Sequence, residues 1–219
     1  VDSVTKVMHS TGMSWELIIV DDGSDDGSTT VIKELTNQDN IKCLLLAKNY
    51  GQTTAIQAGF DNAIGKYLVT LDSDLQNDPK DIPALLHKLI EEELDLVVGW
   101  RKNRKDNYFL RNLPSSIANK LIGNITGVKL HDYGCSLKAY RADVLKEVRL
   151  YGEMHRFIPA WMATKIPASK ISELVVTHHP RIAGKSKYGI SRTFRVFVDL
   201  ISVYFFMRFF SRPGHFFGL

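Results

Sequence analysis

The sequence has few cysteines, and their placement excludes two classes of site. Only two occur among 219 residues, Cys43 in an apolar run and Cys135 directly after Gly134, and no Cys-x-x-Cys pair or Cys/His cluster accompanies them. A structural zinc site or a disulfide framework needs denser spacing. We therefore expect two reduced thiols and a cytosolic compartment.

Long apolar runs are also missing, as is a signal-peptide pattern at the first residues. The most apolar stretch near the C-terminus, residues 200–207, is far shorter than the ~20 residues that a membrane-spanning helix needs. An apolar share of 44% with 24% charged residues fits one globular α/β domain with an appendage.

Charge is unevenly distributed around a modest net value of +4. Acidic residues dominate 21–39 and 72–95, whereas Lys and Arg crowd 101–111 and 181–212. The acidic part is expected to attract a metal ion, and the basic part to attract anions such as phosphates or acidic lipid headgroups. No nucleic-acid motif accompanies the basic clusters, so no nucleic-acid partner is expected.

Apolar strand-like runs alternate with amphipathic helical segments. Strands are predicted at 15–20, 41–47, 67–72 and 94–99, with a later one at 135–141, and helices at 27–35, 52–64 and 82–92. This order predicts right-handed βαβ units and a Rossmann-like, mostly parallel sheet flanked by helices. Residues 1–12 have the pattern of the end of a helix, so we expect a preceding strand that this chain does not contain.

Two of the predicted strands end in carboxylates, Asp21-Asp22 and Asp72-x-Asp74. The carboxyl ends of parallel strands face the crevice where ligands bind. Oxygen ligands on a short turn suit Mg²⁺ or Mn²⁺, which shares its remaining positions with substrate phosphates. A solvated acidic turn is the alternative for Asp72 and Asp74, and an Asx turn that closes the strand is the alternative for Asp21 and Asp22. Asp81, after Pro79, is predicted to cap the next helix.

Several motifs in a fixed order carry a family resemblance. They are Asp21-Asp22-Gly-Ser24, Asn49-x-Gly51, Asp72-x-Asp74-Leu-Gln76-x-Asp-Pro79, Gly99-Trp100-Arg101-Lys-x-Arg104, Asp132-x-Gly134-Cys-x-Leu137-Lys-x-Tyr140-Arg141 and Arg181-x-x-Gly184-Lys185-Ser186-Lys187-Tyr188. Together they resemble family 2 glycosyltransferases of the GT-A fold, and within them the polyprenyl-phosphate glycosyltransferases. The similarity runs from about residue 15 to the C-terminus. It does not include the family's first strand, or the membrane helices that bacterial members carry after this point.

The resemblance implies a role for the polar residues of these motifs. Nucleotide-sugar contacts are expected from Asp21, Asp22, Asp72 and Arg101, and Mg²⁺ or Mn²⁺ ligands from Asp74, Asp72 and Gln76. The lipid phosphate or the diphosphate is expected to contact Arg111, Ser115, Arg181 and Lys185. Ser115 would sit at a helix N-terminus, which favours bound anions.

Asp132 is the expected catalytic residue, on the acceptor side of the sugar. Two roles are open for it. It could take a proton from the acceptor, or it could orient a lipid phosphate that is already ionised, since the second pKa of a phosphate monoester is about 6.

The chain is divided into a catalytic domain, 1–189, and a juxtamembrane segment, 190–219. Arg192, Arg195, Asp199 and Ser202 recur at helical spacing, with apolar residues elsewhere around the helix. We expect an amphipathic helix lying on the membrane interface, with a core helix as the alternative.

The leading hypothesis is an inverting transferase that moves a hexose from a nucleotide sugar onto polyprenyl (undecaprenyl) phosphate at the cytoplasmic face of the cell membrane. UDP-glucose is the first candidate donor, and GDP-mannose or another UDP-sugar are alternatives. A catalytically silent membrane-binding module of the same fold is also open. A processive synthase is disfavoured because its Gln-x-x-Arg-Trp signature is missing, and a receiver domain would be shorter. The oligomeric state is undecided, a homo-oligomer included.

Overall fold

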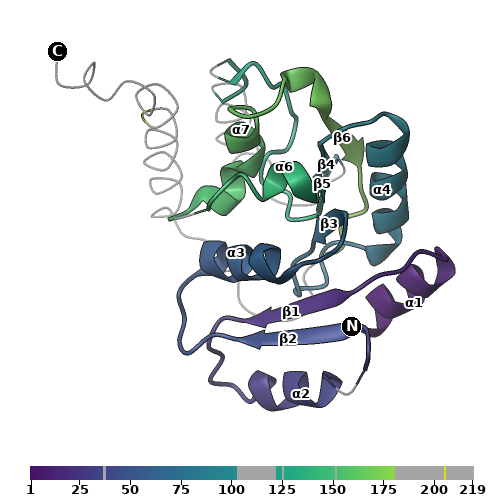
Figure 1. Ribbon diagram of the computed structural model, residues 1–219, viewed down its shortest axis with the longest axis vertical. Coiled ribbons are helices and arrows are strands. Elements are labelled where there is room, and N and C mark those ends of the chain that lie inside the picture. Colours follow the sequence, from purple (N-terminus) through teal and green to yellow (C-terminus); the bar gives the residue numbers. More distant parts are fainter. Residues whose placement is uncertain (37, 103–121, 125, 151, 181–204, 206–219) are drawn as a thin grey trace.

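The computed structural model describes residues 1–36, 38–102, 122–124, 126–150, 152–180 and 205 (Figure 1). Four residues with predicted roles, Arg111, Ser115, Arg181 and Lys185, lie outside these ranges. So does the predicted interface helix in 190–219, apart from Phe205. Within the described ranges, no helix is both long and apolar enough to span a membrane.

Helices and strands alternate through the first half of the chain, as predicted. Within the described ranges, the α-helices are α1 (Asp2–Ser10), α2 (Ser28–Leu35), α3 (Gln52–Asn62), α4 (Ile82–Glu91), α6 (Ala142–Leu145) and α7 (Ile158–Met162). The strands are β1 (Leu17–Asp21), β2 (Ile41–Leu45), β3 (Tyr67–Thr70), β4 (Leu96–Trp100), β5 (Lys138–Arg141) and β6 (Ile171–Val175). Short 3₁₀ helices occupy η1 (Pro79–Asp81), η3 (Met154–Phe157) and η4 (Ala168–Lys170).

The described strands form two sheets. β1 and β2 pair in parallel, and the larger sheet has the order β3-β5-β4-β6. β5 runs antiparallel to both β3 and β4, whereas β4 and β6 are parallel. β3, β4 and β6 therefore share one direction, and the predicted mostly parallel α/β architecture is confirmed. The reversed β5 was not indicated by the sequence pattern.

The core lies between the larger sheet and the helices packed on it. Leu96, Val97 and Val98 of β4 are fully buried, as expected for a strand covered on both faces. Leu85 and Leu89 of α4 are buried beside them. Burying each such leucine contributes about 1.5–3 kcal/mol. The smaller sheet lies between α2 and α3 in Figure 1.

This arrangement brings the ends of β1, β3 and β4 toward the segment that precedes β5. A polar residue that the sequence singled out lies at the end of each strand or within two residues of it. Asp21 closes β1, Asp72 follows β3, and Arg101 follows β4. The site therefore gathers where these elements end.

Candidate active site

One cavity of about 2220 Å³ collects the predicted site residues that lie in the described part of the chain. Its walls include Asp21, Asp22, Asp72, Asp74, Gln76, Arg101 and Asp132. These residues come from four separate stretches of sequence. The fold therefore brings them together as the resemblance implied, although their individual roles stay predictions.

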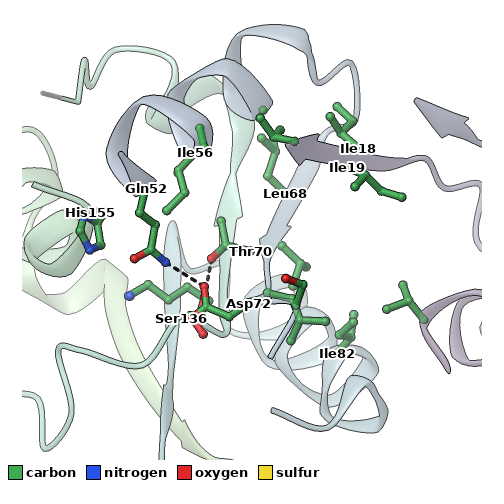
Figure 2. Close-up of a pocket in the computed structure, with 18 of the residues that line it drawn as sticks. Ile18, Ile19, Gln52, Ile56, Leu68, Thr70, Asp72, Ile82, Ser136 and His155 are labelled. Carbon is green, nitrogen blue, oxygen red and sulfur yellow. Dashed lines mark hydrogen bonds between the residues drawn. The ribbon is translucent and has the colours of Figure 1, made fainter. Parts of the chain in front are cut away.

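Asp72 is held at the end of β3 by neighbours from two other elements. Gln52 Nε2, on the first turn of α3, donates to Asp72 Oδ1 over 2.9 Å, and Ser136 supplies a side-chain hydrogen bond (Figure 2). Burial raises the pKa of the Asp72 carboxyl, and the nearby charge of Asp74 acts in the same direction. Two carboxylates in a half-buried position favour a nearby cation.

The turn that carries Asp74 has an unusual backbone. Leu75 has a φ of 61°, in the left-handed region that a leucine rarely adopts, and its side chain is exposed. Asp74 Oδ1 accepts a hydrogen bond from the Gln76 backbone N–H over 3.1 Å, which closes the turn. Strain of this kind is concentrated at ligand-binding sites.

The far side of this turn is tied to the strand-like segment after β6. The His179 backbone N–H donates to the Gln76 carbonyl over 2.7 Å, and His179 Nε2 lies 3.1 Å from Asp78 Oδ2. Asn77 forms an antiparallel bridge with His178. The residues directly before Arg181 are thus attached to the acidic turn.

The capping prediction for Asp81 is wrong. Asp78 accepts from the Lys80 backbone N–H over 3.0 Å and caps η1, whereas Asp81 makes no capping bond to α4. Asp81 Oδ2 instead accepts from the Thr177 backbone N–H over 2.7 Å. The inserted 3₁₀ turn moves the cap three residues earlier in the chain and leaves Asp81 to bind the neighbouring segment.

The oxygen atoms of Asp72, Asp74 and Gln76 suit a divalent cation for which the protein supplies only some of the ligands. Among the described residues, no three His, Cys, Asp or Glu side chains form a complete metal cluster. The carboxylates of Asp72 and Asp74 and the amide of Gln76 line the same cavity wall. Mg²⁺ and Mn²⁺ are commonly bound by one or two carboxylates plus substrate phosphates. These residues therefore suit a metal that arrives with a diphosphate.

Asp132 is paired with Arg101 across the cavity wall. Arg101 Nε donates to Asp132 Oδ2 over 2.7 Å and Arg101 Nη2 donates to Oδ1 over 2.9 Å. Both side chains are mostly buried, with 12% and 14% of their surfaces exposed. The Gly134 backbone N–H also donates to Oδ1 over 3.1 Å. A bidentate pair of this kind fixes the orientation of the carboxylate and also stabilises its negative charge.

The neighbouring residue, His131, is fixed from both sides. Its ring stacks on Trp100 with centroids 4.0 Å apart and planes 13° from parallel. Its backbone N–H donates to Glu173 Oε2 over 2.8 Å, and its ring Nδ1 contacts the same carboxylate. The loop that carries Asp132 is therefore attached to both β4 and β6.

Asp21 and Asp22 both accept hydrogen bonds from other residues of the protein. Asp21 is buried and accepts from the Ser24 and Thr29 hydroxyls, both over 2.6 Å. These bonds, that from Ser24 first, lower the pKa of Asp21. Asp22 accepts from the backbone N–H groups of Tyr50 and Gly51. The local bonds from Ser24 match the turn-forming alternative for Asp21, whereas Asp22 binds the loop before α3. A nucleotide contact by either residue stays a prediction.

Gly23 makes this contact of Asp22 possible. Its φ is 71°, and a Cβ at this position would lie 2.4 Å from the carbonyl carbon of Lys48. Only glycine allows the two loops to approach so closely. The Asp-Asp-Gly motif therefore brings the end of β1 against the start of α3.

Sequence reasoning missed several cavity residues. Gln52, Ser136, Lys138, His155 and Arg156 all line the cavity. The fully buried Lys138 donates to the Cys135 carbonyl, and burial lowers its pKa. His155 Nδ1 lies 2.7 Å from Thr53 Oγ1. Lys138 stood in a quoted motif without an assigned role. His155 belongs to a 3₁₀ turn, which has no periodic pattern.

A comparison with models of protein families shows which family the chain belongs to. Residues 1–149 match the family model described as glycosyl transferase family 2. The chain belongs to this family. The family resemblance read from the motifs is thereby confirmed.

Two curated relatives of this family 2 chain indicate a narrower group. A dodecaprenyl-phosphate galacturonate synthase from Rhizobium johnstonii is 59% identical over 220 residues, which is 100% of this chain and 65% of the relative. An undecaprenyl-phosphate 4-deoxy-4-formamido-L-arabinose transferase from Aeromonas hydrophila is 39% identical, over 91% of this chain and 60% of the relative. The chain thus spans less than two thirds of the length of either relative.

Solved structures support the fold. A mannosyl-3-phosphoglycerate synthase from Rubrobacter xylanophilus superposes with a TM-score of 0.74 at 11% identity, over 93% of this chain and 67% of that one. A glucosyl-3-phosphoglycerate synthase from Mycobacterium tuberculosis, solved with Mn²⁺ and UDP-glucose, gives 0.57 at 12% identity, over 93% and 82%. The predicted GT-A-like fold is confirmed by these neighbours.

Proposed function

We propose that the protein transfers a sugar from a nucleotide sugar to a polyprenyl phosphate, with Mg²⁺ or Mn²⁺ bound beside Asp74. The observation that carries this proposal is that Asp72, Asp74 and Asp132 line one cavity in a family 2 chain. Both curated relatives are named for transfer to a polyprenyl phosphate, which supports the acceptor class.

The donor diphosphate belongs, in this proposal, at the Asp72–Asp74 wall. A metal ion bound there would neutralise charge on the departing nucleotide. Asp74 and Gln76 would hold it from the turn at Leu75, and Gln52 would orient Asp72 through the 2.9 Å hydrogen bond. The M. tuberculosis neighbour, solved with Mn²⁺ and UDP-glucose, makes a divalent ion with a nucleotide sugar a reasonable expectation for this fold.

The acceptor phosphate belongs at the Arg101–Asp132 wall. Inverting transfer needs the acceptor oxygen on the face of the sugar opposite the nucleotide. The fork between Arg101 and Asp132 gives that wall a fixed carboxylate next to a cation. An ionised phosphate needs orientation more than it needs a base, so we assign Asp132 a positioning role. Arg111, Ser115, Arg181 and Lys185 remain candidates for phosphate contacts.

The donor sugar we favour is galacturonic acid rather than glucose. The relative at 59% identity is named for galacturonate, whereas that at 39% is named for a modified arabinose. A uronic acid brings an extra carboxylate into a cavity that Arg101, Lys102, Lys138 and Arg156 line. Glucose, the first candidate donor named from the sequence, remains as a competing donor in the test below.

A lipid acceptor also places the reaction at a membrane surface. We keep the cytoplasmic face as the proposed location and residues 190–219 as the proposed interface segment. A homo-oligomer remains open within this proposal. A silent membrane-binding module is the competing function, and the intact acidic cavity favours the enzyme over it.

The test is a transfer assay with polyprenyl phosphate in detergent or vesicles, read by mass spectrometry of the lipid. UDP-galacturonate, UDP-glucose and GDP-mannose are supplied separately, each with Mg²⁺, with Mn²⁺ and with a chelator. We expect metal-dependent addition of a hexuronate to the lipid phosphate. Addition of glucose instead would change the donor and keep the reaction class. No transfer from any donor, with vesicle binding retained, would favour the silent module.

A further inference from the structure

The cavity contains several carboxylates of the protein, and these set a condition on any acidic sugar. Asp72, Asp74 and Asp132 line its walls, together with Asp21 and Asp22 at the end of β1. A sugar that carries its own carboxylate is repelled by these charges, and the repulsion grows where water is excluded. A uronic acid donor therefore needs a basic side chain in the cavity that attracts its carboxylate.

The basic side chains of the cavity differ in their contacts. Among the described residues, the Lys and Arg side chains that line it are Lys66, Arg101, Lys102, Lys138 and Arg156. Arg101 donates to both oxygens of Asp132, at 2.7 and 2.9 Å. Lys138 is buried on β5, and its Nζ donates to the Cys135 carbonyl. The charge of Arg101 is thus offset by Asp132, and the ammonium of Lys138 is bound within the protein.

Two of the lysines are exposed to solvent. Lys66 precedes β3, at the end of the strand opposite to Asp72. Lys102 follows Arg101, and its Nζ lies 5.4 Å from the centre of the Trp100 ring. An exposed ammonium is strongly hydrated, so it discriminates weakly between an acidic and a neutral ligand. Arg156 has neither limitation to this degree, because only 23% of its side chain is exposed.

Arg156 belongs to η3, whose apolar residues are fixed in the core. Met154 and Phe157 are buried, and residues three apart in a 3₁₀ helix share one face. His155 and Arg156 lie between them and therefore on other faces of η3, where both line the cavity. The helix α7 follows directly, and all its residues are buried. The core thus fixes η3 with these two polar side chains toward the cavity.

A series of polar contacts connects Arg156 to the acidic wall. Arg156 Nε donates to His155 Nε2 over 3.4 Å, and His155 Nδ1 lies 2.7 Å from Thr53 Oγ1. Because Nε2 accepts, Nδ1 carries the ring hydrogen and donates to the threonine hydroxyl. Thr53 is buried on the first turn of α3, beside Gln52, which donates to Asp72. Figure 2 shows His155 and Gln52 together on one side of the drawn pocket.

We propose that Arg156, oriented by His155 and Thr53, binds the carboxylate of the donor sugar and so selects a uronic acid over the neutral hexose. This inference rests on the proposed transfer reaction and adds the residue that recognises the sugar. A guanidinium donates two parallel hydrogen bonds to a carboxylate. A hydroxymethyl group has one oxygen and no charge, so it replaces neither the second bond nor the ionic attraction.

The location of Arg156 agrees with the path of the donor in that reaction. The sugar would occupy the space between the Asp72–Asp74 wall and Asp132. The first turn of α3 contacts Asp72 through Gln52, and α3 packs on η3. Arg156 therefore approaches this space from the side of α3. The acceptor wall, at Asp132, is held by Arg101 instead.

Arg156 also has an acidic neighbour on η3's own segment. Its Nη2 lies 3.4 Å from Glu153 Oε2, and 54% of the Glu153 side chain is exposed. An exposed ion pair of this kind contributes little to stability. A guanidinium has five N–H donors, more than the contacts with His155 and Glu153 use. The pair with Glu153 therefore does not compete strongly with a bound carboxylate.

The first test compares UDP-galacturonate with UDP-galactose, which has a hydroxymethyl group in place of the carboxylate. kcat/KM for each donor is measured with full-length protein, polyprenyl phosphate and Mn²⁺. Wild type should prefer UDP-galacturonate. Arg156→Gln should lower kcat/KM for UDP-galacturonate by about 10- to 100-fold, the loss of a charge-assisted contact, and that for UDP-galactose by less than about threefold. Arg156→Lys keeps the charge without the fork and should retain part of the preference.

Arg149→Gln is the matched control. Arg149 is exposed, pairs with Asp61 of α3 and is not among the residues that line the cavity, so the donor preference should not change. Calorimetric titration of both donors with Mn²⁺, without lipid, separates recognition from chemistry. The preference for UDP-galacturonate should fall in Arg156→Gln and persist in Arg149→Gln. These titrations decide the outcome even where transfer is too slow to measure.

Thr53 tests the positioning part of the proposal. Thr53→Val keeps the shape and removes the hydroxyl that His155 contacts, whereas Thr53→Ser keeps the hydroxyl. The valine variant should lose part of the preference for UDP-galacturonate, and the serine variant should retain it. A structural role alone would lower kcat/KM for both donors equally. Equal preferences in the two variants would remove Thr53 and His155 from the proposal.

Three results would overturn the assignment of Arg156. A preference that persists in Arg156→Gln refutes this inference alone and leaves the transfer reaction in place. Equal losses with both donors, accompanied by a raised KM for the lipid phosphate, would assign Arg156 to the acceptor. A wild-type protein that neither binds nor transfers the uronate better than the neutral hexose would refute the galacturonate donor and this inference together.

Discussion

At the scale of single residues, the pairing of Asp132 with Arg101 limits what the carboxylate can do. Both oxygens accept hydrogen bonds from the guanidinium, and one also accepts from the Gly134 N–H. A carboxylate held in this way is well placed to orient a substrate. It is less well placed to move toward a proton.

We therefore expect Asp132→Asn to lower turnover by less than the 10²–10⁴-fold typical of a lost general base. The loss should be nearly constant between pH 7 and 9, above the second pKa of the phosphate acceptor, about 6. Turnover with saturating donor, measured across this range, is the test. A loss of a thousandfold that changes with pH would instead assign proton transfer to Asp132.

Asp21 gives a prediction on stability against pH. Hydrogen bonds from Ser24 and Thr29 lower its pKa below the usual 3.8, so its ionised form stabilises the fold above that value. This stabilisation is lost as the pH falls through the lowered pKa. Thr29→Val removes one bond to the charged oxygen and should cost about 1–3 kcal/mol at pH 7.

Urea denaturation at pH 7 and at successive lower pH values tests this prediction. The difference between wild type and Thr29→Val should shrink as Asp21 becomes protonated. Thr36→Val is the control, because the Thr36 hydroxyl donates only to the Lys33 carbonyl. A difference that stays constant with pH would mean that the bond to Asp21 is not the source.

At the scale of elements, the turn after β3 combines backbone strain with attachment to a second segment. Leu75, at a φ of 61°, is exposed, so the protein gains little burial from it. The left-handed conformation costs a leucine roughly 1–2 kcal/mol. The hydrogen bond that Asp74 accepts from the Gln76 N–H and the one that the His179 N–H donates to the Gln76 carbonyl hold the turn in place against this cost.

Leu75→Gly should therefore leave stability unchanged or raise it by up to about 1 kcal/mol, since glycine relieves the strain but adds freedom to the unfolded chain. Affinity for UDP with Mn²⁺ should fall, because the turn is less well ordered. Leu75→Ala keeps the strain and is the control. Weaker stability in the glycine variant, with unchanged affinity, would remove the argument from strain.

The positions of helices and strands were predicted from the sequence better than the contacts of single residues. Apolar runs such as 94–99 have the pattern of a buried strand, and β4 forms there because burial on both faces demands that pattern. The antiparallel direction of β5 was not predictable, since strand polarity depends on the connection through 103–134. The capping site was misplaced because Asp78 and Asp81 are both acceptable caps and only the 3₁₀ turn selects between them.

At the scale of the whole molecule, the sequence predicted that the two acidic turns lie together because strand ends meet at one edge, and the family resemblance added Asp132 to the same site. Their partners were not. Gln52 reaches Asp72 from α3, and Lys138 lies under the site on β5. These contacts join residues far apart in sequence, and no local pattern marks them. Arg101 was singled out, but its pairing with Asp132 depends on how the loop before β5 folds back.

We propose that the cavity at the ends of β1 and β3 binds a nucleotide diphosphate through a metal held by Asp74. Isothermal titration of UDP into the full-length protein, with Mn²⁺ and with chelator, tests it most directly. Wild type should bind UDP only with Mn²⁺. Asp74→Ala should lose this binding with its melting temperature preserved, whereas Asp61→Asn, on α3 and paired with Arg149, should bind as wild type does. Unchanged, metal-dependent affinity in Asp74→Ala would show that Asp74 does not hold the metal.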